Sequence, residues 1–288
     1  MNRKLSFILA LLMCFSFVGC KSKPGGTIDL TSNIKVTVKG YNGKGEVYIE
    51  NNTKYDKSNS EIRDFVSDVE YTLAEGENGA LSNDEQIVIK AKYSKSKAND
   101  LGLKIKNTTK KVKVSGLKEL VSGYYDCAIN ISHYGTIKVK LDANNAPITV
   151  SNFVNLADKG FYNGLTFHRI IKGFMIQGGD PKGNGTGGSD ETIKGEFATN
   201  GVNNPLKHTR GAISMARSQA NDSASSQFFI MQKDTSSLDG QYAVFGYVYS
   251  GIEIVDKICD DIKTEDDNGT VLKKNQPIIE SITCTQMN

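Results

Sequence analysis

The chain has 288 residues, of which 38% are apolar and 23% are charged. This composition excludes a disordered polypeptide, and the length suggests two domains. The formal net charge of +3 is too small to demand a polyanionic partner, so we expect no nucleic acid partner.

The first residues predict an export signal. Arg3 and Lys4 form a basic start, and an apolar run follows from Leu5 to Phe17. A run this short is typical of the core of a signal peptide and too short for a membrane span.

Residues 17–20, with the sequence FVGC, resemble the bacterial lipobox, whose cysteine is acylated and becomes the new N-terminus. The first lipobox position is usually leucine, so Phe17 departs from the pattern. This interpretation gives a lipoprotein signal peptide at 1–19 and a palmitate-type lipid on Cys20. It places the protein at the extracytoplasmic face of the cell membrane, held there by the lipid anchor. A plain signal peptide cut elsewhere and an uncleaved anchor are the alternatives.

A polar tether is expected at 20–26, and the sequence after it predicts β structure. We interpret residues 27–116 as a small β-sandwich-like accessory domain. Alternating apolar residues at 34–38, an Asn-Gly turn and a second run at 46–49 predict a hairpin. The spacing over 62–73 fits a helix or a strand. The sequence of this domain contains no catalytic cluster.

Residues 120–288 form the predicted second domain. Two amphipathic segments, at about 147–158 and 250–258, predict helices. The rest indicates an eight-stranded closed antiparallel β-barrel capped by these helices, so the fold class is all-β dominated. The eight strand-like runs are 124–131, 136–142, 167–172, 174–177, 211–216, 227–231, 243–248 and 278–284.

The cysteines indicate no metal site. Once Cys14 leaves with the signal peptide and Cys20 is acylated, Cys127, Cys259 and Cys284 remain at wide spacing. No C-x-x-C pair occurs, and the three histidines show no ligand spacing, so we expect neither a metal nor a cofactor. Cys127 and Cys284 are either buried thiols or a disulfide pair, and we favour buried thiols.

Residues 167–180, FHRIIKGFMIQGGD, resemble the signature of the cyclophilin family of peptidyl-prolyl cis/trans isomerases. Four further blocks follow in the family's order: GNGTGG at 183–188, GAISMA at 211–216, SQFFI at 226–230 and LDGQYAVFG at 238–246. The resemblance covers about residues 124–284. It implies an enzyme that rotates X–Pro bonds in proline-containing polypeptides, and we expect a monomer.

The resemblance also implies residue roles. Arg169 is the expected catalytic residue, because a charged guanidinium can donate a hydrogen bond to the prolyl nitrogen when amide resonance is broken. Gln177 would bind the substrate and help to hold Arg169, and Tyr242 would donate its hydroxyl to a substrate carbonyl. The other expected substrate-binding residues are the proline socket of Phe174, Met175, Phe229 and Leu238, the peptide-pairing Ala216 and Arg217, and Gln227 and Phe228 along the same groove.

Three positions depart from the family pattern, and a fourth suggests a structural role instead of a catalytic one. Ser237 stands where animal cyclophilins commonly carry a tryptophan that binds cyclosporin, so we expect only weak cyclosporin binding. Arg217 and Tyr242 stand where Asn and His are frequent. Because side chains alternate along a strand, we expect His168 to face away from Arg169 and to make a structural hydrogen bond.

The sequence therefore predicts a surface lipoprotein that accelerates X–Pro rotation in exported or cell-surface polypeptides and assists their folding. The alternative is a non-catalytic surface lipoprotein that binds proline peptides or the cell wall.

Overall fold

The computed structural model describes residue 23 and residues 25–288. The predicted signal peptide at 1–19, the lipid site at Cys20 and part of the tether lie outside the described residues. Within the described residues, no helix has the length and apolarity needed to cross a membrane.

The described chain forms two compact units. The first holds the residues up to Val38 together with Val47–Asn78 and Asp84–Val114. The second holds Lys39–Glu46, Gly79–Asn83 and Ser115–Asn288. Two short segments of the predicted accessory region thus belong to the second unit. The domain limits given above stay predictions.

The first unit contains small sheets and two short helices. Strand β1 pairs with β6 in parallel, β2 pairs with β3, and β4, β5 and β7 form an antiparallel sheet in the order β4-β5-β7. The pairing of β2 with β3 is the predicted hairpin, and the ambiguous segment contains both a helix and a strand. The sandwich-like arrangement stays a prediction. The elements are β1 (Gly26–Asp29), β2 (Lys35–Lys39), β3 (Glu46–Glu50), α1 (Ser60–Ser67), β4 (Glu70–Glu75), β5 (Gln86–Lys92), α2 (Lys95–Asp100), β6 (Leu103–Lys106) and β7 (Thr109–Lys113).

The second unit is built on one eight-stranded antiparallel sheet, which confirms the eight predicted strands. The strand order is β10-β11-β13-β12-β14-β9-β8-β15. The strands are β8 (Tyr124–Ile131), β9 (Gly135–Asp142), β10 (Thr166–Ile171), β11 (Met175–Asp180), β12 (Ala212–Met215), β13 (Phe228–Met231), β14 (Val244–Ser250) and β15 (Ile279–Gln286).

The two edge strands of this sheet, β10 and β15, approach each other at one place. The amide of Phe167 donates to the carbonyl of Pro277 at 2.9 Å, and the amide of Ile279 donates to the carbonyl of Leu165 at 2.7 Å. These bonds curl the sheet so that its edges meet near the start of β15. Closure along the whole edge stays a prediction.

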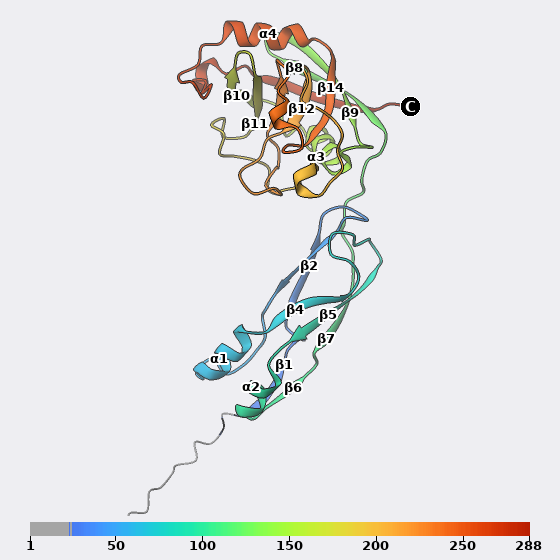
Figure 1. Ribbon diagram of the computed structural model, residues 1–288, viewed down its shortest axis with the longest axis vertical. Coiled ribbons are helices and arrows are strands. Elements are labelled where there is room, and N and C mark those ends of the chain that lie inside the picture. The colour runs from blue at the N-terminus through green and yellow to red at the C-terminus, as the bar shows by residue number, and fades with distance from the viewer. Residues whose placement is uncertain (1–22, 24) are drawn as a thin grey trace, which may run out of the picture. The chain divides into compact units, whose positions relative to one another are not determined.

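Two helices, α3 (Pro147–Asp158) and α4 (Ile252–Asp261), pack against the strands (Figure 1). Pro147 occupies the first turn of α3, where its missing amide costs no hydrogen bond. Phe153 of α3 is fully buried, and its ring contacts those of Tyr162, Phe228 and Phe245. This aromatic cluster fills the inside of the curled sheet.

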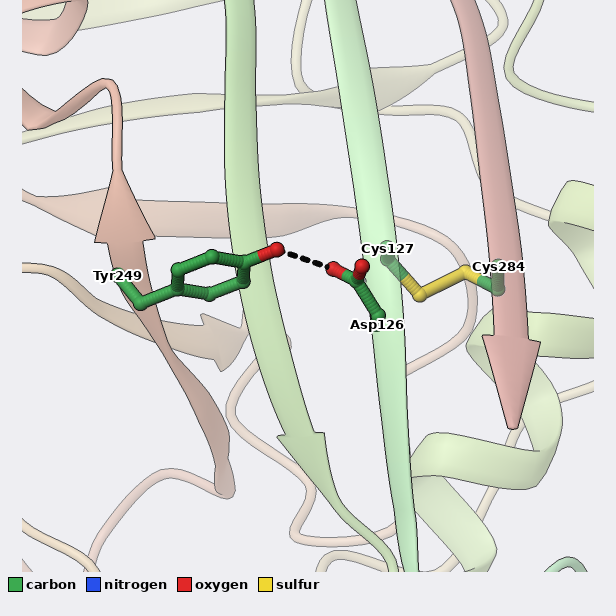
Figure 2. Close-up of a disulfide and its surroundings, with 4 residues drawn as sticks. All are labelled: Asp126, Cys127, Tyr249 and Cys284. Atoms are coloured by element: carbon green, nitrogen blue, oxygen red, sulfur yellow. Dashed lines mark hydrogen bonds between the residues drawn. A yellow bond between two sulfur atoms is a disulfide. The ribbon is translucent and has the colours of Figure 1, made fainter. Parts of the chain in front are cut away.

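A disulfide joins Cys127 on β8 to Cys284 on β15 (Figure 2). The two residues are direct partners in the antiparallel register, with their Cα atoms 4.1 Å apart. The favoured interpretation of buried thiols is therefore wrong, and the alternative of a pair is confirmed. The two cysteines are 157 positions apart in the sequence. Sequence spacing alone does not reveal that the strand register makes them neighbours. Cys259 remains free and buried, and burial raises the pKa of its thiol to about 12.

Removing this disulfide should lower the stability of the second unit. In a Cys127→Ala/Cys284→Ala variant, we expect the free energy of unfolding to fall by about 2–4 kcal/mol, because a cross-link over a long loop restricts the unfolded chain. Urea unfolding followed by circular dichroism measures the change, with Cys259→Ala as the control that leaves the disulfide intact. A double variant that unfolds at the same urea concentration as the oxidised parent contradicts this expectation.

Candidate active site

Four strands place a row of residues on one face of the sheet. In the register, Arg169 on β10 lies opposite Gln177 on β11, Gln177 lies opposite Phe229 on β13, and Phe229 lies opposite Ser214 on β12. Paired residues in neighbouring strands share a face of the sheet. The row therefore gathers a cation and an amide from two consecutive strands and an aromatic ring from a strand that is distant in sequence.

A bulge in β10 aims Arg169 into this row. Phe167 pairs with Gly178 and Arg169 pairs with Gln177, so His168 is one extra residue on β10. Such a bulge breaks the alternation of side chains and turns the strand locally. His168 consequently lines the same cavity as Arg169.

The prediction that His168 faces away from Arg169 and makes a structural hydrogen bond is wrong. Its side chain is buried, and neither ring nitrogen has a hydrogen-bond partner in the part of the chain that the structure describes. Burial lowers the pKa of this imidazole, while Asp180 opposes the shift.

An open cavity of about 710 Å³ lies over the row. One wall is apolar. Met175 and Phe229 are buried there, and the other members of the wall are half-buried against them. The apolar lining residues are Phe174, Met175, Ala216, Phe229, Leu238 and Tyr242. The predicted proline socket is thus gathered on one wall, beside Arg169.

Two hydrogen bonds hold the guanidinium of Arg169. Its Nε donates to the carbonyl of Asn268 at 2.7 Å, and its Nη1 donates to Oε1 of Gln177 at 3.2 Å. A guanidinium has five N–H donors, so three remain without an acceptor among the described residues. Burial lowers the pKa of Arg169, and Tyr242 and Asp266 oppose the shift. The group stays charged, because an arginine guanidinium does not lose its proton in proteins.

The orientation of the Gln177 amide is fixed by a short chain of hydrogen bonds. The Nε2 of Gln227 donates to the carbonyls of Gly185 and Gly187 at 3.1 and 2.7 Å. Its Oε1 is therefore the acceptor for Nε2 of Gln177, at 2.9 Å. That bond leaves Oε1 of Gln177 facing Arg169. The glycine-rich loop thus sets which atom of Gln177 meets the guanidinium.

The segment around Asn268 is a part of the site that the sequence analysis missed. The amide of Ile170 donates to the carbonyl of Gly269 at 2.8 Å, so this segment runs beside β10. Asp266 accepts hydrogen bonds from the amide and hydroxyl of Thr270, at 3.0 and 2.9 Å, which closes the turn. The Asp-Asn-Gly sequence at 267–269 was a turn signal, but nothing in it pointed to Arg169.

His208 is a second residue that the sequence analysis missed. Its ring stacks on Phe229 with a centroid distance of 5.9 Å and an interplanar angle of 13°. Nδ1 lies 3.0 Å from a carboxylate oxygen of Asp239, and Nε2 lies 3.1 Å from Oγ of Ser214. These two contacts fix the imidazole plane, and the imidazole supports the aromatic wall of the cavity.

Two predicted groove residues lie elsewhere. Phe228 pairs with Gly178 and Met215, one position out of step with the Phe229 row, and therefore faces the other side of the sheet. It is fully buried in the aromatic core, so its predicted place along the groove is wrong. Gln227 does not line the cavity and acts on it through Gln177.

The other predicted residues line the cavity. Ala216 and Arg217 follow β12, and the guanidinium of Arg217 lies 4.8 Å from the ring centroid of Tyr242. The hydroxyl of Tyr242 has no hydrogen-bond partner among the described residues. The same part of the chain contains no group of three or more His, Cys, Asp or Glu that could hold a metal ion.

Comparison with known proteins identifies the fold and its activity. Residues 127–283 match the family described as cyclophilin type peptidyl-prolyl cis-trans isomerase/CLD. The chain belongs to the cyclophilin family. The second unit is accordingly a peptidyl-prolyl cis-trans isomerase with the cyclophilin fold.

Individual cyclophilins agree with this assignment. A peptidyl-prolyl cis-trans isomerase of Helicobacter pylori is 51% identical over 126 residues, which cover 43% of this chain and 74% of the relative. Isomerase B of Bacillus subtilis is 46% identical over 138 residues, which cover 48% of this chain and 87% of the relative. A Cryptosporidium parvum cyclophilin, crystallised in the presence of the dipeptide Ala-Pro, superposes with a TM-score of 0.50 at 31% identity, covering 56% of this chain and 99% of that one.

Displacing the Asn268 segment should reduce cyclophilin activity. Gly269 has φ +81°, and a Cβ there would lie 2.4 Å from the carbonyl oxygen of Ile170. We expect Gly269→Ala to push the segment off β10, move the guanidinium and lower kcat/KM by roughly tenfold to a hundredfold, since about 1 Å of misplacement can cost that much. A protease-free proline-peptide assay measures the rate.

Gly201→Ala is the matched control. Gly201 has a similar φ of +76°, but a Cβ there meets no atom within 4 Å. This variant carries the same backbone strain and should keep the parent rate. Equal kcat/KM in the two variants contradicts the role given to the Asn268 segment.

Proposed function

We propose that this cyclophilin rotates X–Pro bonds in exported polypeptides while a lipid on Cys20 anchors it to the outer face of the cell membrane. The basic and apolar start of the chain and the sequence FVGC at 17–20 support export and lipidation. We also expect a monomer, and weak cyclosporin binding because Ser237 stands where animal cyclophilins commonly carry a tryptophan.

The disulfide is the observation that carries the exported location. Disulfides persist in oxidising compartments and are rare where thioredoxin and glutathione keep thiols reduced. Cys127 and Cys284 lie inside the isomerase unit itself, on its adjacent strands β8 and β15. The paired cysteines therefore support folding outside the cytoplasm, independently of the N-terminal sequence.

The catalytic role proposed for Arg169 follows from the chemistry of the amide. Rotation about a peptide bond has a barrier of about 18–20 kcal/mol, because the C–N bond loses its resonance as it twists. The prolyl nitrogen then gains a lone pair that neither planar isomer offers. A fixed N–H donor binds the twisted amide more strongly than either planar form, which is the requirement for catalysis. Arg169 supplies such donors at the cavity without any covalent step.

The remaining lining residues would bind the ground state and the transition state alike. Phe174, Met175, Phe229 and Leu238 form an apolar wall of suitable character for the proline ring. Tyr242 offers a free hydroxyl to a substrate carbonyl. Ala216 offers its backbone carbonyl, since its amide already donates to the carbonyl of Gln227 at 3.0 Å. The apolar wall fixes one side of the amide while the other side turns.

Loss of the guanidinium should remove most of the activity. We expect Arg169→Ala to lower kcat/KM by about 10²–10³-fold, the usual effect of deleting one preorganised donor to a transition state. The protease-free proline-peptide assay measures this, with Arg63→Ala as a control that removes an exposed arginine of the first unit. Parent-like rates for Arg169→Ala rule out the proposed role.

Lipidation has its own test. Cells that express the full chain and are fed an alkyne-tagged palmitate should label this protein and hold it in the membrane fraction. A Cys20→Ala variant should lose the label and leave that fraction, since the acyl chains supply the membrane affinity. An unlabelled parent protein, or a labelled Cys20→Ala variant, contradicts the proposed anchor.

A further inference from the structure

The charges around the substrate cavity have one sign. Its lining contains four cationic side chains, those of Arg169, Lys182, Arg217 and Lys273, and no aspartate or glutamate. A cavity lined by one sign of charge focuses the electric field and raises the local concentration of oppositely charged ligands. The excess of positive charge should therefore affect which proline-containing segments bind in the cavity.

The two arginines are already engaged within the protein. Arg169 donates to Asn268 and Gln177. Arg217 donates to the carbonyls of Gln241, Ser218 and Gln219, at 3.0, 2.9 and 3.1 Å. Neither guanidinium is free to reorient toward a charged side chain of a bound peptide without breaking these contacts.

The two lysines are free. Lys182 and Lys273 are exposed, and the ammonium group of neither has a hydrogen bond or an ion pair to a described residue. A surface lysine with no partner is common, but two on the rim of one substrate cavity form a recognition feature. Each can approach a charged group of a bound peptide without breaking an existing contact.

Two of the nearby carboxylates, those of Asp180 and Asp266, are committed to other contacts. Asp180 is buried, and it accepts hydrogen bonds from the amides of Lys182, Asn184 and Gly185. Asp266 accepts hydrogen bonds from Thr270, and its charge opposes the lowering of the pKa of Arg169. Glu265 and Asp267 are exposed on the same turn but do not line the cavity.

A buried glutamine joins the two loops that carry these lysines. Gln276 is 7% exposed, and its Nε2 donates to the carbonyls of Gly183 and Val271, both at 2.9 Å. Gly183 follows Lys182, and Val271 lies two positions before Lys273. The loops are thus fixed to each other, and the lysine backbones have defined positions on one rim.

We propose that this rim selects acidic substrates, so that the isomerase acts preferentially on proline segments carrying Asp or Glu beside the X–Pro bond. The proposal rests on the isomerase activity and adds a substrate class to it. Exposed ion pairs are individually weak, so we expect a preference of about three- to tenfold in kcat/KM from two lysines acting together. The preference should fall as salt rises from 0.05 to 1 M, because the Debye length shrinks to about 3 Å.

The test compares matched peptide substrates. The enzyme is the chain from residue 21 to residue 288, which contains every described residue. One series varies the residue before proline among Glu, Gln and Lys, and a second series varies the residue after it. Exchange between cis and trans forms is measured by NMR, without a coupling protease. The parent should favour the Glu peptide over the Gln peptide in at least one series and disfavour the Lys peptide.

Variants assign the preference to the rim. In Lys182→Gln/Lys273→Gln, the Glu-to-Gln ratio of kcat/KM should fall to about one. In Lys233→Gln/Lys263→Gln, which removes two exposed lysines that do not line the cavity, the ratio should equal that of the parent. Equal rates for the Glu and Gln peptides with the parent, or a ratio that survives in the rim variant, overturn the proposal. Failure to accelerate even the Gln peptide would instead count against the isomerase activity.

Discussion

The hydrogen bonds that fix Arg169 are the constraint on which the site depends. The guanidinium is held from two sides, by the Asn268 carbonyl on a turn after α4 and by the Gln177 amide on β11. Neither partner is a carboxylate, so the positive charge is positioned without being neutralised by direct contact. A donor held in this way needs little energy to reorient when the amide twists. This preorganisation is the condition for electrostatic catalysis.

Other parts of the isomerase unit position Arg169 and the residues around it. The bulge at His168 turns the strand that carries Arg169, and the curled sheet places Gln177 and Phe229 in register beside it. His208 supports the ring of Phe229 from behind. The glycine-rich loop, pinned by Asp180, presents the carbonyls that orient Gln227 and through it Gln177. The guanidinium of Arg169, the apolar wall of the cavity and the glycine-rich loop are therefore connected through direct contacts.

The sequence predicted the parts of this structure that depend on local pattern. Alternation gave the strands, and Pro147 marked the start of α3 correctly. The family blocks brought Arg169, Gln177 and Phe229 together. The failures concern register: the extra residue at His168, the face taken by Phe228, the pairing of Cys127 with Cys284, and the approach of Asn268. Each depends on which backbone segments lie opposite each other and in which register, and one bulge or one-residue offset reverses the face.

The most direct test separates the charge of Arg169 from its geometry. Lysine keeps the positive charge but lacks the planar fork that two fixed acceptors hold. In exchange NMR with a proline peptide, an Arg169→Lys variant should still bind the peptide, seen as chemical-shift changes in the cavity residues, while catalysed cis/trans exchange falls at least tenfold. Exchange at the parent rate in that variant would contradict the claim that a positioned guanidinium rotates the bond.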